Sequence, residues 1–200
     1  MLDGHERLIF IDGMAHSGTT ILAYVLRQHP DIFLFTNGGA QVVLESDDVA
    51  HRRVGVLSSV LYSHTQKWVL VKRPWMISAY RDWLIREIPK AKFIYCEREF
   101  DKIVKSWEKP TSFVANSLRE ASREQKRLFH EIQTAVAHDF GRYVQHLNFV
   151  KHQAMLDNPK KTVDDIAEWL GLAPFEFDVS MVGEDKDIKA VIGAELTPTV

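Results

Sequence analysis

The chain has a single cysteine, no apolar run long enough to cross a bilayer, and no excess of positive charge. The lone Cys96 excludes an intrachain disulfide framework and is typical of a reducing compartment. The lack of a long apolar run predicts that no segment spans a membrane. A formal net charge of −2 disfavours a general nucleic-acid surface, so any anion site must be a local cluster.

Two other patterns are missing. Residues 1–7 lack the charged-then-apolar order of a secretory signal, so we expect a cytoplasmic protein. The histidines and the cysteine show no spacing typical of a metal site, so we expect no bound metal. The length of 200 residues and a hydrophobic content of 46% predict one domain over residues 1–200, and the polar, weakly patterned tail from about residue 183 is compatible with a mobile extension.

The most informative stretch is residues 8–27, which reads as a strand, a glycine loop and the start of a helix. The apolar run that begins at Leu8 ends at Gly13, and apolar residues return at helical spacing after Thr19. Glycines at positions 13 and 18 allow a tight turn and a close approach of the backbone to a ligand. Loop amides and the helix N-terminus then form a cradle for a phosphate group.

The spacing Gly13-x4-Gly18 is that of a nucleoside-triphosphate loop, but Thr19 stands where that motif needs lysine. Thr20 keeps the hydroxyl position, and His16 is the only ionisable side chain inside the loop. As a spacing alone, the pattern also fits a glycine-containing turn in any α/β protein.

A second anion-binding pattern follows the strand that we expect over residues 92–96. Arg98 lies just past its end, and Ser106 falls eight residues later on the next predicted helix. A guanidinium can bind two phosphate oxygens while a hydroxyl donates to the third. The alternative for Arg98 is a surface salt bridge with a neighbouring acid.

Short apolar runs alternate with helical patterns along the whole chain. We expect strands over residues 8–12, 32–35, 68–71, 92–96 and 147–150. Helices are expected after Thr19, over 51–64, from Pro74, over 101–107, over about 117–145 with a possible break near Gly141, and over 153–156 and 163–170. The alternation predicts an α/β three-layer sandwich, P-loop NTPase-like, with a mainly parallel central sheet of about five strands flanked by helices.

At these motifs the chain resembles the sulfotransferases that use 3′-phosphoadenylyl sulfate (PAPS). Their loop typically reads Lys/Arg-Ser-Gly-Thr-Thr, and here the segment 16–20 reads His-Ser-Gly-Thr-Thr. The Arg98 and Ser106 pair resembles the family's grip on the 3′-phosphate, and Lys72-Arg73-Pro74 resembles a family Lys-x-Pro step. Residues 147–172 resemble the family's last strand and closing helix.

The resemblance implies a sulfuryl transfer from PAPS to a hydroxyl or amine of a small-molecule or glycan acceptor, with 3′,5′-diphosphoadenosine (PAP) as product and no metal required. It implies that the donor is bound by Ala15, His16, Ser17, Gly18, Thr19, Thr20, Arg98 and Ser106. His16 and Lys72, with Arg73 as the near alternative to Lys72, would stabilise charge on the leaving group. Glu45 is the first candidate for the general base, followed by His51 and His64.

Two other functions fit part of the pattern. A P-loop nucleotide kinase shares the fold and the cradle, but it would need Gly-Lys-Thr and a carboxylate for magnesium. A non-catalytic PAP- or nucleotide-binding module is compatible with histidine at position 16.

Residues 162–172 also resemble the start of a DNA-binding helix-turn-helix, but an acidic, proline-broken segment follows, so we reject that reading. The sequence leaves the acceptor and the oligomeric state open.

Overall fold

A five-stranded sheet forms the centre of the fold in the computed structural model, which describes residues 2–35, 57–108 and 116–182. The strand order is β2-β3-β1-β4-β5 and every neighbouring pair is parallel. The strands are β1 Leu8–Gly13, β2 Ile32–Phe35, β3 Trp68–Lys72, β4 Lys92–Glu97 and β5 His146–Lys151. Their carboxyl ends therefore meet at one edge of the sheet.

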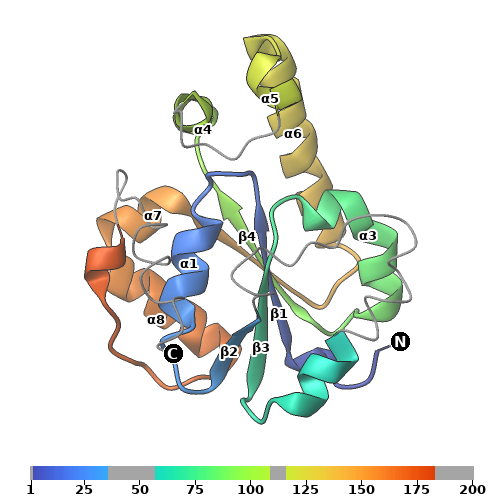
Figure 1. The fold of residues 1–200 in the computed structure, drawn as a ribbon, viewed down its shortest axis with the longest axis vertical. Coiled ribbons are helices and arrows are strands. Elements are labelled where there is room, and N and C mark those ends of the chain that lie inside the picture. The colour runs from blue at the N-terminus through green and yellow to red at the C-terminus, as the bar shows by residue number, and fades with distance from the viewer. Residues whose placement is uncertain (1, 36–56, 109–115, 183–200) are drawn as a thin grey trace, which may run out of the picture.

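Helices cover both faces of this sheet (Figure 1). One face carries α1 Thr19–Leu26, α7 His152–Asp157 and α8 Pro159–Leu170. The other carries α3 Met76–Glu87 and the second half of α6 Arg123–Phe140. The first half of α6, with α4 Phe100–Trp107 and α5 Asn116–Glu120, extends beyond the carboxyl edge of the sheet. The predicted three-layer α/β sandwich is confirmed.

The remaining regular segments are short. Residues 57–63 are helical, and single 3₁₀ turns occupy His5–Arg7 and Val179–Met181. Within the described ranges, no helix combines the length and the apolar character that crossing a membrane requires.

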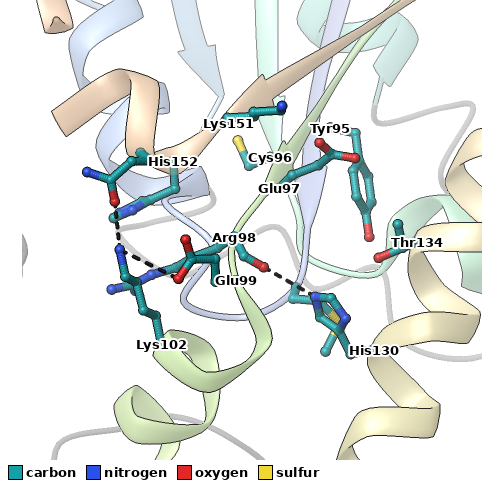
Figure 2. A pocket seen from close by; sticks show the side chains of 12 residues that line it. Tyr95, Cys96, Glu97, Arg98, Glu99, Lys102, His130, Thr134, Lys151 and His152 are labelled. Carbon is teal, nitrogen blue, oxygen red and sulfur yellow. Dashed lines mark hydrogen bonds and ion pairs between the residues drawn. The ribbon is translucent and has the colours of Figure 1, made fainter. Parts of the chain in front are cut away.

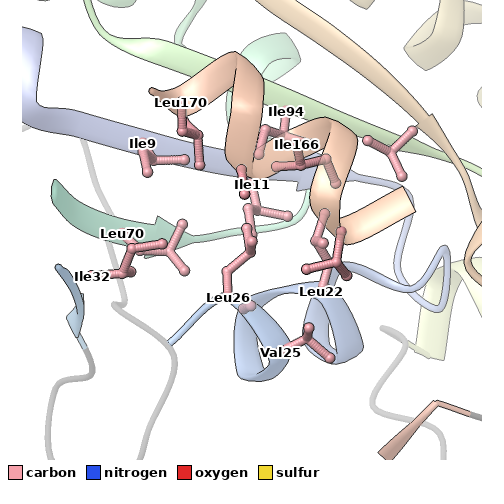
Figure 3. Packing of buried hydrophobic residues seen from close by; sticks show 14 of the residues in the cluster. Ile9, Ile11, Leu22, Val25, Leu26, Ile32, Leu70, Ile94, Ile166 and Leu170 are labelled. Atoms are coloured by element: carbon pink, nitrogen blue, oxygen red, sulfur yellow. The ribbon is translucent and has the colours of Figure 1, made fainter. Parts of the chain in front are cut away.

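Alternating side chains of the strands fill two separate apolar layers. Ile9 and Ile11 of β1 pack with Leu26 of α1 and Ile166 of α8 (Figure 3). Phe10, between them in sequence, points to the opposite layer, where its ring stacks on that of Phe93 at 5.5 Å. Because both faces are covered, all six residues of β1 are buried, which explains why the strand reads as an apolar run up to Asp12.

The helix expected over 117–145 is two helices. The segment α5 ends at Glu120, and α6 begins at Arg123 after Ser122. The Ser122 hydroxyl accepts from the Gln125 amide at 3.2 Å, and the Ser122 amide donates to the Gln125 side chain at 2.8 Å. This capping box fixes a helix start, and a Ser-x-x-Gln pattern could have indicated it. At the other end, α6 stops before Gly141, as expected.

Candidate functional site

The loop between β1 and α1 is tightly folded around its two glycines. Gly13 and Gly18 have φ angles of 146° and 97°, which favour glycine. A Cβ atom at Gly13 would lie 2.5 Å from the Ser17 hydroxyl and 2.6 Å from the Cys96 carbonyl oxygen. A Cβ atom at Gly18 would lie 2.5 Å from the His152 ring. Neither position accommodates another residue without displacing its neighbours, so the loop geometry depends on both glycines.

Polar groups in this loop are suited to an anion. Ser17 is 1% exposed, and its hydroxyl has no hydrogen-bond partner among the described residues. Gly18 is the N-cap of α1 and has no side chain to satisfy the first amide groups of that helix. Ala15, His16 and Thr20 remain partly exposed. A buried unpaired donor beside a helix N-terminus indicates a site for a negatively charged ligand group.

The second predicted motif packs directly against this loop. Arg98 donates to the His16 carbonyl at 2.8 Å, and the same nitrogen lies 3.4 Å from the Ser106 hydroxyl. Trp107 on α4 also donates from its indole to the Ala15 carbonyl at 3.1 Å. The structure therefore brings the two anion-binding motifs together, although more than eighty residues separate them in the chain.

The segment after β3 lies beside the same loop. The Arg73 amide donates to the Ile11 carbonyl at 2.9 Å, and the Trp75 amide donates to the Gly13 carbonyl at 3.3 Å. The Arg73 guanidinium lies over the ring of Tyr80 at 5.1 Å, on α3. The charge of Lys72 acts on the Cys96 thiol and opposes the burial effect that raises the pKa of that thiol. The Lys72 charge thus lies within electrostatic reach of the buried end of β4.

A buried carboxylate, which the sequence analysis did not single out, joins the loop to this segment. Asp12 is 1% exposed and accepts from the amides of Gly13 at 2.6 Å, Met76 at 3.1 Å and Ile77 at 2.6 Å. Its carboxylate caps α3 at Met76 and Ile77. The helix therefore begins at Met76, whereas the sequence predicts a start at Pro74. An acid inside a buried strand needs partners, and that was the available signal.

Burial raises the pKa of Asp12 from 3.8 to about 6, against the opposing effect of its amide donors. The folded protein therefore keeps a proton that the unfolded chain releases between these two values. We expect the free energy of unfolding contributed by Asp12 to be highest below about pH 4 and to fall by roughly 2 to 3 kcal/mol as the pH rises through about 6. Urea unfolding of wild type and Asp12→Asn across this range measures the effect, and parallel curves would contradict it.

A cavity of about 380 Å³ opens at the ends of β4 and β5, between α4, α6 and α7 (Figure 2). Its lining combines both signs of charge with histidines. Lys102 donates to the Gln153 side chain at 2.6 Å, and the His130 ring lies 3.3 Å from the Arg98 carbonyl oxygen. His130 and His152 could not be predicted as lining residues from the sequence, because only the fold brings α6 and α7 to this edge. The lining residues are Met14, Tyr95, Cys96, Glu97, Arg98, Glu99, Lys102, His130, Thr134, Lys151, His152 and Gln153.

Of the three candidates for the general base, only His64 lies among the residues that the structure describes. Glu45 and His51 lie outside the described residues. His64 lies at the amino-terminal end of the sheet, where its ring stacks on Phe33 at 3.5 Å and its carbonyl accepts from Arg7. Since the loop lies at the carboxyl edge, the structure does not bring His64 to the site.

Sequence comparison identifies the family. The profile described as "Sulfotransferase family" matches residues 47–176, and the chain therefore belongs to this family. Among curated proteins, no sequence matches significantly. Membership supports sulfuryl transfer as the general activity of the site.

Solved structures agree on the fold. The sulfotransferase domain from the Synechococcus PCC 7002 olefin synthase is 17% identical, with a TM-score of 0.59, over 96% of this chain and 88% of that chain. A sulfotransferase from Alicyclobacillus acidocaldarius is 18% identical, with a TM-score of 0.60, over 95% and 91%. Mouse sulfotransferase SULT7A1, complexed with PAP, is 14% identical, with a TM-score of 0.51, over 98% and 66%. At these identities the likeness concerns the fold.

Proposed function

We propose that this sulfotransferase uses PAPS as donor and transfers its sulfuryl group to a hydroxyl or amine of a small-molecule or glycan acceptor, releasing PAP. One observation carries the proposal. Arg98 donates to the loop carbonyl of His16 while lying next to Ser106, so the two predicted anion-binding motifs adjoin at one edge of the sheet. A nucleotide with phosphates at both its 3′ and 5′ positions needs two such sites.

The loop from Ala15 to Thr20 would hold the 5′-phosphosulfate through its amides, with hydroxyls from Ser17, Thr19 and Thr20. The buried hydroxyl of Ser17, which has no hydrogen-bond partner in the described part of the chain, supports this assignment. Arg98 and Ser106 would bind the 3′-phosphate, one through a forked guanidinium and the other through its hydroxyl. The solved mouse sulfotransferase with bound PAP supports this choice of nucleotide.

Sulfuryl transfer requires donor and acceptor in line and stabilisation of the charge left on the donor. A bond forms between sulfur and the acceptor oxygen or nitrogen, and the bond from sulfur to the phosphate oxygen breaks. We assign His16 and Lys72 to the charge that develops on that oxygen, where one such donor typically contributes roughly 3 kcal/mol. Glu45 stays our candidate for accepting the acceptor's proton. That no metal is needed also stays a prediction.

Binding of PAP and ATP separates the proposed function from a nucleotide kinase. We expect isothermal titration to give tighter binding of PAP than of ATP, with the same PAP affinity in magnesium and in EDTA. Thr19 in place of the P-loop lysine supports that order, because lysine is the usual partner of the β- and γ-phosphates. Tighter, magnesium-dependent binding of ATP would contradict the proposal.

A non-catalytic PAP-binding module is a second candidate, since His16 stands where related loops carry lysine or arginine. Release of PAP from PAPS in the presence of a panel of alcohols, phenols, amines and glycans distinguishes the two. Acceptor-dependent release supports the enzyme, and tight PAP binding without any release supports the module. The single domain over residues 1–200 and the cytoplasmic location also remain proposals.

A further inference from the structure

Asp12 is the only carboxylate among the buried side chains of the described residues. It lies between the anion-binding loop and the segment that follows β3. One carboxylate oxygen accepts from Gly13 of the loop and from Met76 of α3, and the other accepts from Ile77. These hydrogen bonds join Gly13 of the loop to the start of α3 in the interior of the protein. The carboxylate therefore helps to set the relative position of these two backbone segments.

Only an ionised carboxylate can accept from all three amides without a conflict. Asparagine offers one acceptor oxygen, and its NH₂ group would face one of the backbone donors. A protonated carboxyl also turns part of its oxygen surface into a donor. The arrangement is therefore specific for the charged side chain, although burial disfavours that charge.

The segment held by Asp12 is conformationally strained. Trp75 has a φ of 63°, a left-handed conformation that is costly for an aromatic residue. Its amide donates to the Gly13 carbonyl, and its ring packs with Met14 and Trp107 beneath the loop. Such strain persists where the surroundings enforce it, and strained backbones are concentrated at functional sites. Here the strained turn lies three residues after Lys72.

We propose that Asp12 is a positioning residue, which holds the start of α3, and with it the preceding Lys72–Trp75 segment, against the anion-binding loop and so sets where the Lys72 ammonium stands relative to the transferring group. The inference rests on the proposed function. Asp12 is buried and acts through these backbone contacts. Its own oxygens are occupied by the three amides.

The charge state of Asp12 then links the geometry to pH. Ionisable groups on the surrounding elements are Tyr95 and Cys96 on β4, whose pKa values the charge of Asp12 raises, and Lys72 on β3. Burial also raises both of those pKa values, so neither group titrates near neutral pH. His16 in the loop is the other group whose ordinary pKa falls near this range. Loss of the Asp12 charge below about pH 6 should change the hydrogen bonds that place the segment and so lower the turnover rate.

The test is Asp12→Asn, with the exposed Asp31→Asn as a matched control. We expect kcat for PAPS turnover to fall about tenfold or more in Asp12→Asn, with the dissociation constant for PAP changed less than about threefold. The wild-type kcat should fall as the pH drops through about 6, and this limb should be absent from Asp12→Asn but present in Asp31→Asn and in His16→Gln. A uniform loss of kcat and PAP affinity with an unchanged pH profile would overturn the proposal.

A second measurement uses wild-type protein and needs no turnover. Amide hydrogen exchange should show protection factors at Met76 and Ile77 that rise about tenfold between pH 7 and pH 5, because opening the segment returns Asp12 to its ordinary pKa, while those in the middle of β1 stay constant. Constant protection at Met76 and Ile77 would overturn the proposal even if Asp12→Asn did not fold. Because this readout is independent of sulfuryl transfer, it also separates a failure of this inference from a failure of the proposed function.

Discussion

PAP should bind to Arg98→Ala at least about 100-fold more weakly than to wild type, while AMP, which lacks the 3′-phosphate, loses no more than about threefold. Removing one partner of a hydrogen-bonded charge pair typically costs 2 to 5 kcal/mol, and about 100-fold is the lower part of that range. AMP keeps only the interactions with the loop. The difference between the two nucleotides therefore isolates the 3′-phosphate from any general damage to the fold.

The Arg98 measurement is isothermal titration of both nucleotides into wild type, Arg98→Ala, Ser106→Ala and Arg127→Ala. Ser106→Ala should lose about tenfold in PAP affinity, since a single hydroxyl donor to a charged group contributes less than a guanidinium. Arg127 of α6 is the control, because its guanidinium lies over the ring of Phe100, at the start of α4, 5.4 Å from the ring centre. Equal losses for PAP and AMP in Arg98→Ala would show that Arg98 supports the loop through His16 rather than binding a 3′-phosphate.

The fold could be predicted from the sequence because its signals are local. The central strands β1, β3 and β4 are largely buried and read as apolar runs, and each predicted strand lies within a residue or two of an observed one. The boundary between α5 and α6 was missed because Ser122 was treated as one more polar residue of a long helix. A helix start depends on a few specific hydrogen bonds, which periodicity does not report.

The two anion-binding motifs were also predictable, since each is a short pattern at the end of a strand. What the pattern could not give is the contact between Arg98 and the His16 carbonyl, which depends on the parallel pairing of β1 with β4. The role of Asp12 was missed for a similar reason. Its partners Met76 and Ile77 are more than sixty residues away in the chain, and within residues 8–13 it reads only as a break in an apolar run.

Glu97 and His138 illustrate the same limit at the cavity. Their side chains lie 3.3 Å apart, one at the end of β4 and the other on the second half of α6. The His138 ring also stacks on Phe149 of β5 at 4.3 Å. Neither residue belongs to a recognisable motif, and forty residues separate them. Packing of α6 across the sheet brings them together, and single-sequence patterns do not determine that packing.

Lys72→Ala should lower kcat about 100- to 1000-fold, with the dissociation constant for PAP changed less than about threefold. Removing one preorganised donor from the developing charge of a transition state typically costs about 3 to 4 kcal/mol. PAP carries no transferring group, so its binding should depend little on that donor. Single-turnover kinetics with PAPS, together with titration of PAP, separate the two effects.

Three further variants determine whether the position of Lys72 or its charge is responsible. Lys67→Ala removes a lysine at the opposite end of the same strand, where its ammonium donates to the Gly171 carbonyl, and should leave kcat unchanged. Lys72→Arg should recover only part of the rate, because a planar guanidinium does not reproduce a compact ammonium. Arg73→Ala should cost less than about tenfold, since that guanidinium lies on the Tyr80 ring. A larger loss in Arg73→Ala than in Lys72→Ala would transfer the catalytic role to Arg73. It would also mean that the turn held by Asp12 rearranges when the donor binds.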